Sequence, residues 1–252
     1  MNSILWIMQT QAQAPEDDEW LSPTERRLLT GLRFPKRRLD WRLGRWTAKR
    51  ALCMLLAQAE PARVLLEEKH AQLLRDLPGD CTPETAMAAF ELRAGATGAP
   101  EMFWRKQPLA LALSLSHSEG SCVAALAPEA WPLGCDLEAV QPRNALFLAD
   151  YFTSAEQALV LSAADAEQPL LTNLLWSAKE SCLKALRQGL RRDPRSVEVQ
   201  LSAAAAPAGW QQFTARCHET GRKFHGWWQP LPGFVLTLVT HHITSPPLEL
   251  SL

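Results

Sequence analysis

Residues Leu170 to Arg187 read LLTNLLWSAKESCLKALR. Apolar residues recur through this stretch at intervals of three and four, which is the spacing of a helix with one buried stripe. We expect the helix to end at Gly189, which can supply the left-handed position after the last turn. Trp176, Glu180 and Lys184 stand four residues apart on another face, so their side chains share one ridge. The helix therefore holds a carboxylate and an ammonium one turn apart beside an aromatic ring.

A second stretch adds two more carboxylates. Residues 133–138 read LGCDLE, and their alternation predicts a strand whose apolar residues share one face. Asp136 and Glu138 then project together from the other face and repel one another. If Glu180 joins them, the three carboxylates need a compensating cation, and ligation by oxygen alone favours a hard ion such as Mg²⁺. Since Mg²⁺ in proteins commonly serves phosphoryl substrates, the pattern indicates phosphate chemistry.

Positive charge is concentrated near the N-terminus, although the chain of 252 residues carries a net charge of only −1. Ten of the 26 basic residues lie between Arg26 and Arg50. A helix predicted over residues 36–60 carries several of them on one face: Arg38, Arg42, Arg45 and Lys49. This cluster suits a phosphate group, and the alternative interpretation is an ordinary solvated basic face.

Composition limits the class of protein. The chain is 47% hydrophobic and 21% charged, as is usual for one large globular domain or two smaller ones. It shows no secretory signal and no apolar run long enough to span a membrane, so we expect a cytoplasmic protein. The six cysteines form no C-x-x-C pair, so neither zinc nor a disulfide framework is indicated.

The remaining patterns predict one further helix and several short strands. Ser22-Pro23-Thr24-Glu25 is a capping box that begins a helix reaching about Leu32. Strict alternation over residues 109–116 predicts a strand, and residues 122–127 return as its hairpin partner. Further strands are predicted over residues 4–8, 197–201, 211–217, 223–229 and 234–240, with a loose tail at residues 245–247.

A short internal repeat divides the chain. Residues 46–49 read WTAK and residues 176–179 read WSAK, each on a predicted helix and half the chain apart. The repeat favours a duplicated fold with its boundary between Pro128 and Leu133.

The two acidic stretches also resemble known signatures. LGCDLE at residues 133–138, followed by WSAKESCLK at residues 176–184, resembles the paired motifs of the 4′-phosphopantetheinyl transferases. SLSHS at residues 114–118 resembles a third element of that family. The resemblance implies an Sfp-type α+β fold in which two similar α/β halves, residues 1–130 and 131–252, form a monomeric pseudodimer. Each half would pack a small, mostly antiparallel sheet on a long helix.

The resemblance further implies a reaction and its residues. The phosphopantetheine group of coenzyme A would pass to a serine of an apo acyl or peptidyl carrier protein, releasing 3′,5′-ADP. Asp136, Glu138 and Glu180 would hold Mg²⁺, Glu180 would also serve as base, and Lys184 would bind phosphate and assist the leaving group. The coenzyme A phosphates would contact Arg38, Arg45, Lys49, Ser116, His117 and Lys179. For Lys179 a structural ion pair is the alternative.

Two other function classes remain. Three carboxylates also suit a Mg²⁺-dependent nuclease or phosphohydrolase, although such a strand should carry a lysine at position 140, where this chain has Val140. The basic helix could instead dock an acidic partner in a protein without catalytic activity. The near-neutral net charge and the absence of a nucleic-acid-binding motif argue against a nucleic-acid partner.

Overall fold

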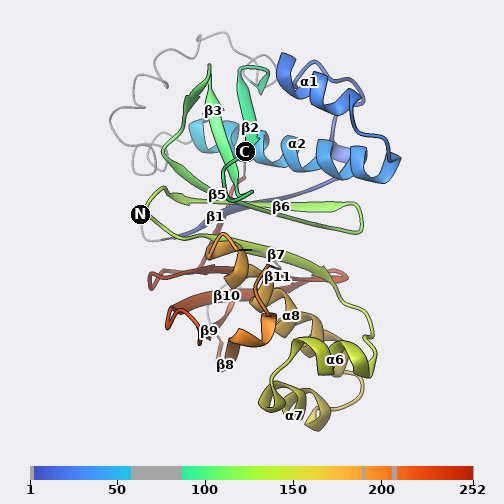
Figure 1. Cartoon of the computed structure of the whole chain (residues 1–252), viewed down its shortest axis with the longest axis vertical. Helices are drawn as coiled ribbons and strands as arrows, with labels where there is room; N and C mark the ends of the chain where they lie inside the picture. The colour runs from blue at the N-terminus through green and yellow to red at the C-terminus, as the bar shows by residue number, and fades with distance from the viewer. Residues whose placement is uncertain (1–2, 58–86, 189–190, 206–208, 252) are drawn as a thin grey trace. The chain divides into compact units, whose positions relative to one another are not determined.

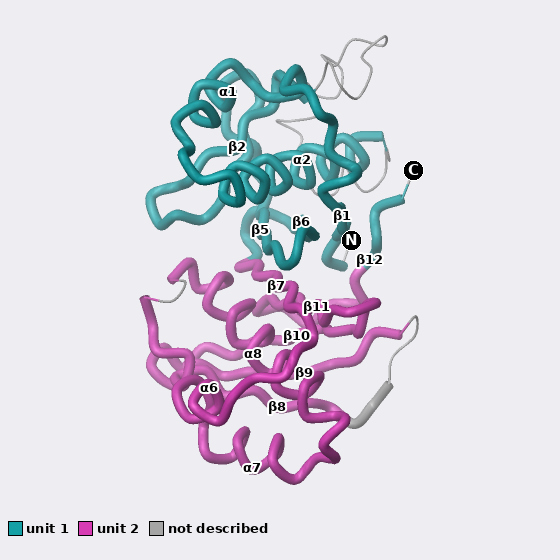
Figure 2. Tube along the Cα trace, turned by 90° about the vertical axis from the view of Figure 1, so that its right-hand side faces the viewer, with its two compact units in different colours: residues 1, 3–131, 248–252 teal, residues 2, 132–247 magenta. Residues whose placement is uncertain are grey.

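Runs of helices and runs of strands follow one another along the chain in a mixed α+β structure (Figure 1). This computed structural model describes residues 3–57, 87–188, 191–205 and 209–251, with only the backbone described at residues 203–205. The chain divides into two compact units, which Figure 2 colours separately. Unit 1 comprises residues 3–131 and the last strand, and unit 2 comprises residues 132–247.

Unit 1 packs a long helix on a four-stranded sheet. The strand order is β12-β1-β6-β5, and β2, β3 and β4 form a separate three-stranded sheet. Ala48, Leu52 and Leu55 of α2 are buried in one core with residues of both sheets. The elements are β1 Leu5–Thr10, α1 Pro23–Thr30, α2 Pro35–Ala57, β2 Phe90–Ala94, β3 Pro100–Trp104, β4 Gln107–Pro108, β5 Leu111–Ser118, β6 Ser121–Pro128 and β12 Leu248–Glu249, with a 3-10 turn at Gln11–Gln13.

The predicted helices and strands of this unit lie close to the observed ones. The predicted end of the second helix at residue 60 falls outside the described residues. Residues 245–247, predicted to be loose, form no helix or strand, and the next residues form β12, which was not predicted and pairs in parallel with β1. Leu248 donates its backbone N–H to Ile4 and Leu250 donates to Trp6, at 2.9 and 2.8 Å. The end of the chain, expected in the second half, therefore completes the sheet of unit 1.

Unit 2 lays helix α8 across one five-stranded sheet. Its strand order is β7-β11-β10-β9-β8, and every neighbouring pair is antiparallel. Leu175, Ala178 and Cys182 of α8 are buried against Val199 and Phe213 of the sheet. The elements are β7 Gly134–Ala139, α6 Ala145–Tyr151, α7 Ser154–Ser162, α8 Gln168–Ala185, β8 Val197–Ala205, β9 Gln211–Cys217, β10 Lys223–Leu231 and β11 Phe234–Thr240, with a 3-10 turn at Pro194–Ser196.

Helix α8 ends earlier than the sequence predicts. Arg187 takes the left-handed position, with φ of 55°. Its N–H donates to Lys184 at 2.8 Å, and the N–H of Gln188 donates to Leu183 at 3.1 Å. This pair of bonds is a Schellman cap, which satisfies carbonyls that the last turn would otherwise leave open. Gly189, the predicted end, lies outside the described residues.

A glycine and two serines fix α8 against the sheet. A side chain at Gly134 would place its Cβ 1.8 Å from the carbonyl oxygen of Ser181, so only glycine permits this approach of β7. Ser177 Oγ donates to the carbonyl of Asp136 at 3.2 Å. Ser177 and Ser181 also hydrogen-bond the hydroxyl of Thr237 on β11, at 2.9 and 2.6 Å. These contacts set the register of the α8 ridge beside the acids of β7.

Unit 2 buries a complete ion pair beneath this helix. Thr153 and Glu156 form the capping box of α7. The Glu156 carboxylate also accepts from Lys179 Nζ at 2.8 Å and from the N–H of Val199 at 3.0 Å. Lys179 is fully buried, and its ammonium also donates to the carbonyls of Pro194 and Val197. One glutamate thereby ties α7, α8 and β8 together.

Unit 1 contains the same arrangement. Ser22 and Glu25 form the capping box of α1. Glu25 accepts from the buried Lys49 of α2 and from the N–H of Leu92 on β2. Lys49 also donates to the carbonyl of Trp20 at 3.1 Å. The lysines that end WTAK and WSAK thus have equivalent partners. The strand pairing is also repeated, because β1 pairs antiparallel with β6 in unit 1 and β7 pairs antiparallel with β11 in unit 2.

No helix among the described residues has both the length and the apolar composition needed to cross a bilayer.

Glu156→Gln should lower the free energy of unfolding by about 3–5 kcal/mol, because it leaves the buried Lys179 without its compensating charge. Urea unfolding followed by tryptophan fluorescence measures the effect. Glu219→Gln is the matched control, since the carboxylate of Glu219 is 53% exposed in its pair with Arg192. It should change stability by less than about 1 kcal/mol. Equal stability of the two variants would contradict a structural role for the buried pair.

Candidate functional site

Asp136, Glu138 and Glu180, here called the acid cluster, lie where β7 meets α8. The ridge of α8 faces the two acids of β7 along its length. Trp176 Nε1 donates to Glu138 Oε1 at 3.1 Å. Lys184 Nζ donates to Asp136 Oδ1 at 2.7 Å and to the carbonyl of Cys135 at 3.0 Å. The structure thus brings together the strand acids and the helix ridge that the sequence singles out.

Burial and repulsion act together on these carboxyls. Burial, and then the charge of Asp136, raise the pKa of Glu180 from 4.5 to about 7, against an opposing effect of Lys184. The same two causes raise the pKa of Glu138 from 4.5 to about 7, although Arg143, Trp176 and Lys184 oppose them. The positive groups nearby therefore do not fully compensate the acid cluster.

The lysine of the ridge stays charged. Burial acts to lower the pKa of Lys184, but the charge and hydrogen bond of Asp136, together with Cys135 and Glu180, shift the pKa upward overall. Its ammonium is therefore a permanent positive charge against Asp136.

The donor atoms suit a hard divalent cation. All are carboxylate oxygens, which such ions prefer. Glu180 Oε1 is buried and accepts no hydrogen bond from any described residue. No three His, Cys, Asp or Glu side chains of the described residues stand close enough to form a ready-made metal site. Asp136 and Glu138 instead form ion pairs with Lys184 and Arg143, at 2.7 and 2.9 Å.

Sequence reasoning missed Arg143 and Asn173. Arg143 follows β7 and donates to Glu138 Oε2 at 2.9 Å and to Asn173 Oδ1 at 2.9 Å. Asn173 is fully buried on α8 and donates to the carbonyls of Gln141 and Pro169. Neither residue belongs to a motif or a periodic pattern. The one sequence signal was position, since Asn173 precedes Trp176 by three residues on the same helix.

Apart from Lys49, four of the predicted coenzyme A contacts belong to unit 1. His117 of β5 is exposed and Arg38 of α2 is half-buried, so both can reach a ligand. Ser116 is buried, with 8% of its surface exposed. Arg45 is also largely buried: its guanidinium lies 3.3 Å from the ring centre of Trp41, and burial lowers its pKa to about 10.

Lys49 and Lys179 differ from their predicted roles. Both side chains are fully buried and are committed to glutamates of their own units. Neither ammonium is therefore accessible to a coenzyme A phosphate in this structure. Lys179 forms a structural ion pair, which was the alternative interpretation for this residue, and Lys49 also forms one.

The basic cluster is also partly neutralised within unit 1. Arg42 donates to Asp18 at 2.8 Å and to the carbonyls of Pro15, Glu16 and Asp17. The acidic loop before α1 thus covers one member of the predicted basic face.

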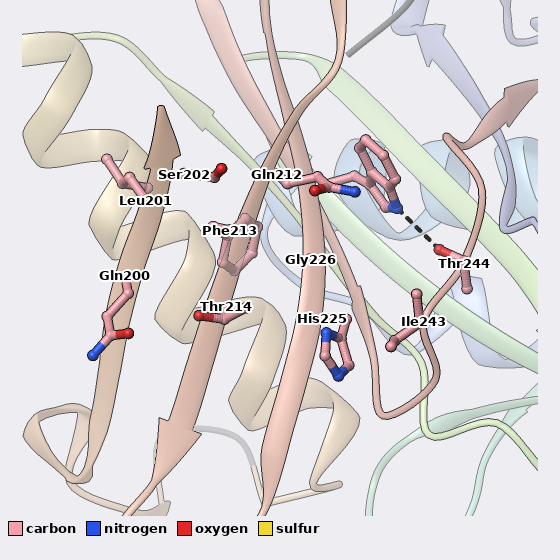
Figure 3. Close-up of a pocket in the computed structure, with 11 residues that line it drawn as sticks. Gln200, Leu201, Ser202, Gln212, Phe213, Thr214, His225, Gly226, Ile243 and Thr244 are labelled. Atoms are coloured by element: carbon pink, nitrogen blue, oxygen red, sulfur yellow. Dashed lines mark hydrogen bonds between the residues drawn. The ribbon is translucent and has the colours of Figure 1, made fainter. Parts of the chain in front are cut away.

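A cavity of about 460 Å³ lies elsewhere in unit 2, on strands β8, β9 and β10 (Figure 3). Its polar lining includes Gln200, Gln212, Thr214 and His225, and Trp227 Nε1 donates to Thr244 Oγ1 beside them at 2.9 Å. No member of the acid cluster lines this cavity, so it adds nothing to the carboxylate site.

Glu180→Gln should raise the free energy of unfolding by roughly 1–3 kcal/mol at about pH 8 in the absence of divalent cations. The folded-state pKa of Glu180 is raised from 4.5 to about 7, so stability present below pH 4.5 is lost as the pH rises to 7. The variant removes that loss. Urea unfolding at about pH 8 and at about pH 4 measures it, with similar stabilities expected at the lower pH. A variant less stable than the parent at the higher pH would contradict the raised pKa of Glu180.

Comparison with known proteins gives a match for part of unit 2. No curated protein matches the chain. A family model does match residues 132–239, a range that includes the acid cluster, Arg143 and Lys184. Arg38, Arg45, Ser116 and His117 lie outside the matched range. The family described by that model is the 4′-phosphopantetheinyl transferase superfamily.

Proposed function

We propose that this chain transfers the 4′-phosphopantetheine group of coenzyme A to a serine of an apo acyl or peptidyl carrier protein, releasing 3′,5′-ADP. The observation that carries the proposal is the meeting of the α8 ridge with Asp136 and Glu138, inside the range that matches the superfamily. The repeated capping box and buried lysine of the two units support a duplicated fold, and we propose that it is an Sfp-like pseudodimer that acts as a monomer.

In this proposal Asp136, Glu138 and Glu180 hold Mg²⁺, which when bound would neutralise charge on the pyrophosphate of coenzyme A. Glu180 accepts the proton of the carrier serine at Oε1, an oxygen that accepts no hydrogen bond from the described residues. Its pKa of about 7 suits a general base at neutral pH. The serine oxygen bonds to the phosphorus that bears pantetheine, and the bond from that phosphorus to the bridging oxygen breaks.

Lys184 stabilises the group that leaves. Its ammonium already donates to a carboxylate oxygen of Asp136 and lies within the electrostatic reach of Glu180. A phosphate oxygen of the substrate is an acceptor of the same charge and geometry, so Lys184 can donate to 3′,5′-ADP as negative charge develops on it.

Residues of unit 1 would supply the remaining phosphate contacts. Arg38 and His117 present accessible donors, whereas Arg45 and Ser116 are largely buried on the same two elements. We propose that this group recognises the 3′-phosphate and pyrophosphate of coenzyme A.

Incubation with coenzyme A, Mg²⁺ and an apo carrier protein should add about 340 Da to the carrier, the mass of one phosphopantetheine arm. Glu180→Gln should reduce the rate by roughly 10²–10⁴-fold, because it removes both a ligand and the base. Intact mass spectrometry of the carrier measures both effects, and Glu219→Gln should transfer at the parent rate. If several carriers gain no mass while the chain hydrolyses phosphodiesters with Mg²⁺, the phosphohydrolase alternative is correct.

Arg38→Ala should raise KM for coenzyme A about tenfold or more, the cost of one charged hydrogen bond. The same change should leave KM for dephospho-coenzyme A unaltered, since that substrate lacks the 3′-phosphate. Initial rates with both substrates form a cycle that isolates the contact. Arg37→Ala, an exposed neighbour on the same helix, is the control. Equal losses with both substrates would remove Arg38 from the 3′-phosphate site.

A further inference from the structure

Arg143 contacts β7, α8 and α6. One guanidinium nitrogen donates to Glu138 Oε2, and its Nε donates to Asn173 Oδ1, both at 2.9 Å. The guanidinium carbon also lies 4.9 Å from the ring centre of Phe147 on α6. The side chain of Arg143 is 22% exposed, so surrounding protein atoms restrict its movement.

The groups that hold Arg143 are themselves fixed. Asn173 is fully buried, and its amide donates at 2.7 Å to both Gln141 and Pro169. Phe147 packs edge-on against Trp176, with ring centres 5.2 Å apart. Trp176 donates to the second oxygen of Glu138 at 3.1 Å. Both oxygens of this carboxylate therefore meet donors that belong to one packed assembly.

We infer that Arg143 is a positioning residue that orients the Glu138 carboxylate toward a divalent cation bound at the acid cluster. The inference rests on the proposed function for the metal, but not on the transfer reaction. Each oxygen of Glu138 keeps a second lone pair after accepting its hydrogen bond, so the carboxylate can still bind a cation. Partners that orient a ligand in this way typically change metal affinity about 10–100-fold when they are removed.

A lysine at this position separates the effect of orientation on metal affinity from the effect of charge. Arg143 uses two nitrogens of one rigid planar group to reach Asn173 and Glu138 together, whereas a lysine presents a single charged nitrogen. Arg143→Lys keeps the positive charge and its repulsion of a metal ion. A loss of metal affinity in this variant therefore reports orientation, because the charge is unchanged.

The experiment measures Mn²⁺ binding to the full chain at about pH 8 by the electron paramagnetic resonance signal of free Mn²⁺, with and without coenzyme A. Both Arg143→Lys and Arg143→Met should raise the Kd for Mn²⁺ about tenfold or more. Arg195→Lys and Arg195→Met are matched controls on an exposed arginine of the same unit, and they should leave the Kd unchanged. Urea unfolding should show that every Arg143 and Arg195 variant is folded under the conditions of the binding measurement.

Two outcomes would overturn the inference. One is a Kd for Mn²⁺ that Arg143→Lys leaves unchanged, and the other is a parent chain that binds no Mn²⁺ in either condition. If carriers gain phosphopantetheine while the Kd ignores Arg143, the inference fails and the proposed function survives. If the Kd depends on Arg143 but no carrier gains mass, the inference survives and the proposed function fails.

Discussion

The close approach of α8 to β7 is the constraint on which the site depends. Gly134 leaves room for the carbonyl of Ser181, and Ser177 bonds the backbone of Asp136 itself. A helix fixed so near a strand brings Glu180 beside Asp136 whether or not their charges agree. Burial of Glu180, and then the charge of Asp136, raise the pKa of this carboxyl to about 7. Packing forces of the core thus hold together carboxylates that water would separate.

That conflict is partly resolved by protein cations. Lys184 forms an ion pair with Asp136, and Arg143 forms one with Glu138. One oxygen of Glu180, in contrast, accepts no hydrogen bond from the described residues. A site whose charge is incompletely balanced lowers stability, and it binds a cation more readily than a balanced one would. Residual negative charge is therefore both the cost of the acid cluster and the property that a metal-dependent reaction needs.

The sequence predicted the elements better than their surroundings. Periodicity located α8 and the alternating strands, because repeats of 3.6 and 2 residues follow directly from burial on one face. It also predicted that Trp176, Glu180 and Lys184 share a ridge. The partners of that ridge were harder to find: Arg143 and Asn173 carry no pattern, since their contacts depend on how the segment after β7 folds back. The capping of α8 by Arg187 was missed because glycine is the usual residue at that position.

Burial separates lysines that the family resemblance treats alike. The resemblance implies phosphate contacts for Lys49, Lys179 and Lys184, all of which lie on helices. Burial lowers the pKa of Lys49 and Lys179, although a capping-box glutamate opposes it, and both ammoniums are enclosed. Lys184 is 26% exposed at its side chain and faces Asp136 from the edge of the helix. A helix turns about 100° per residue, so the five residues from Lys179 to Lys184 rotate the side chain from the interior to the site. Accessibility, which depends on that rotation and on the fold of each unit, separates a lysine that holds the protein together from one that can meet a substrate.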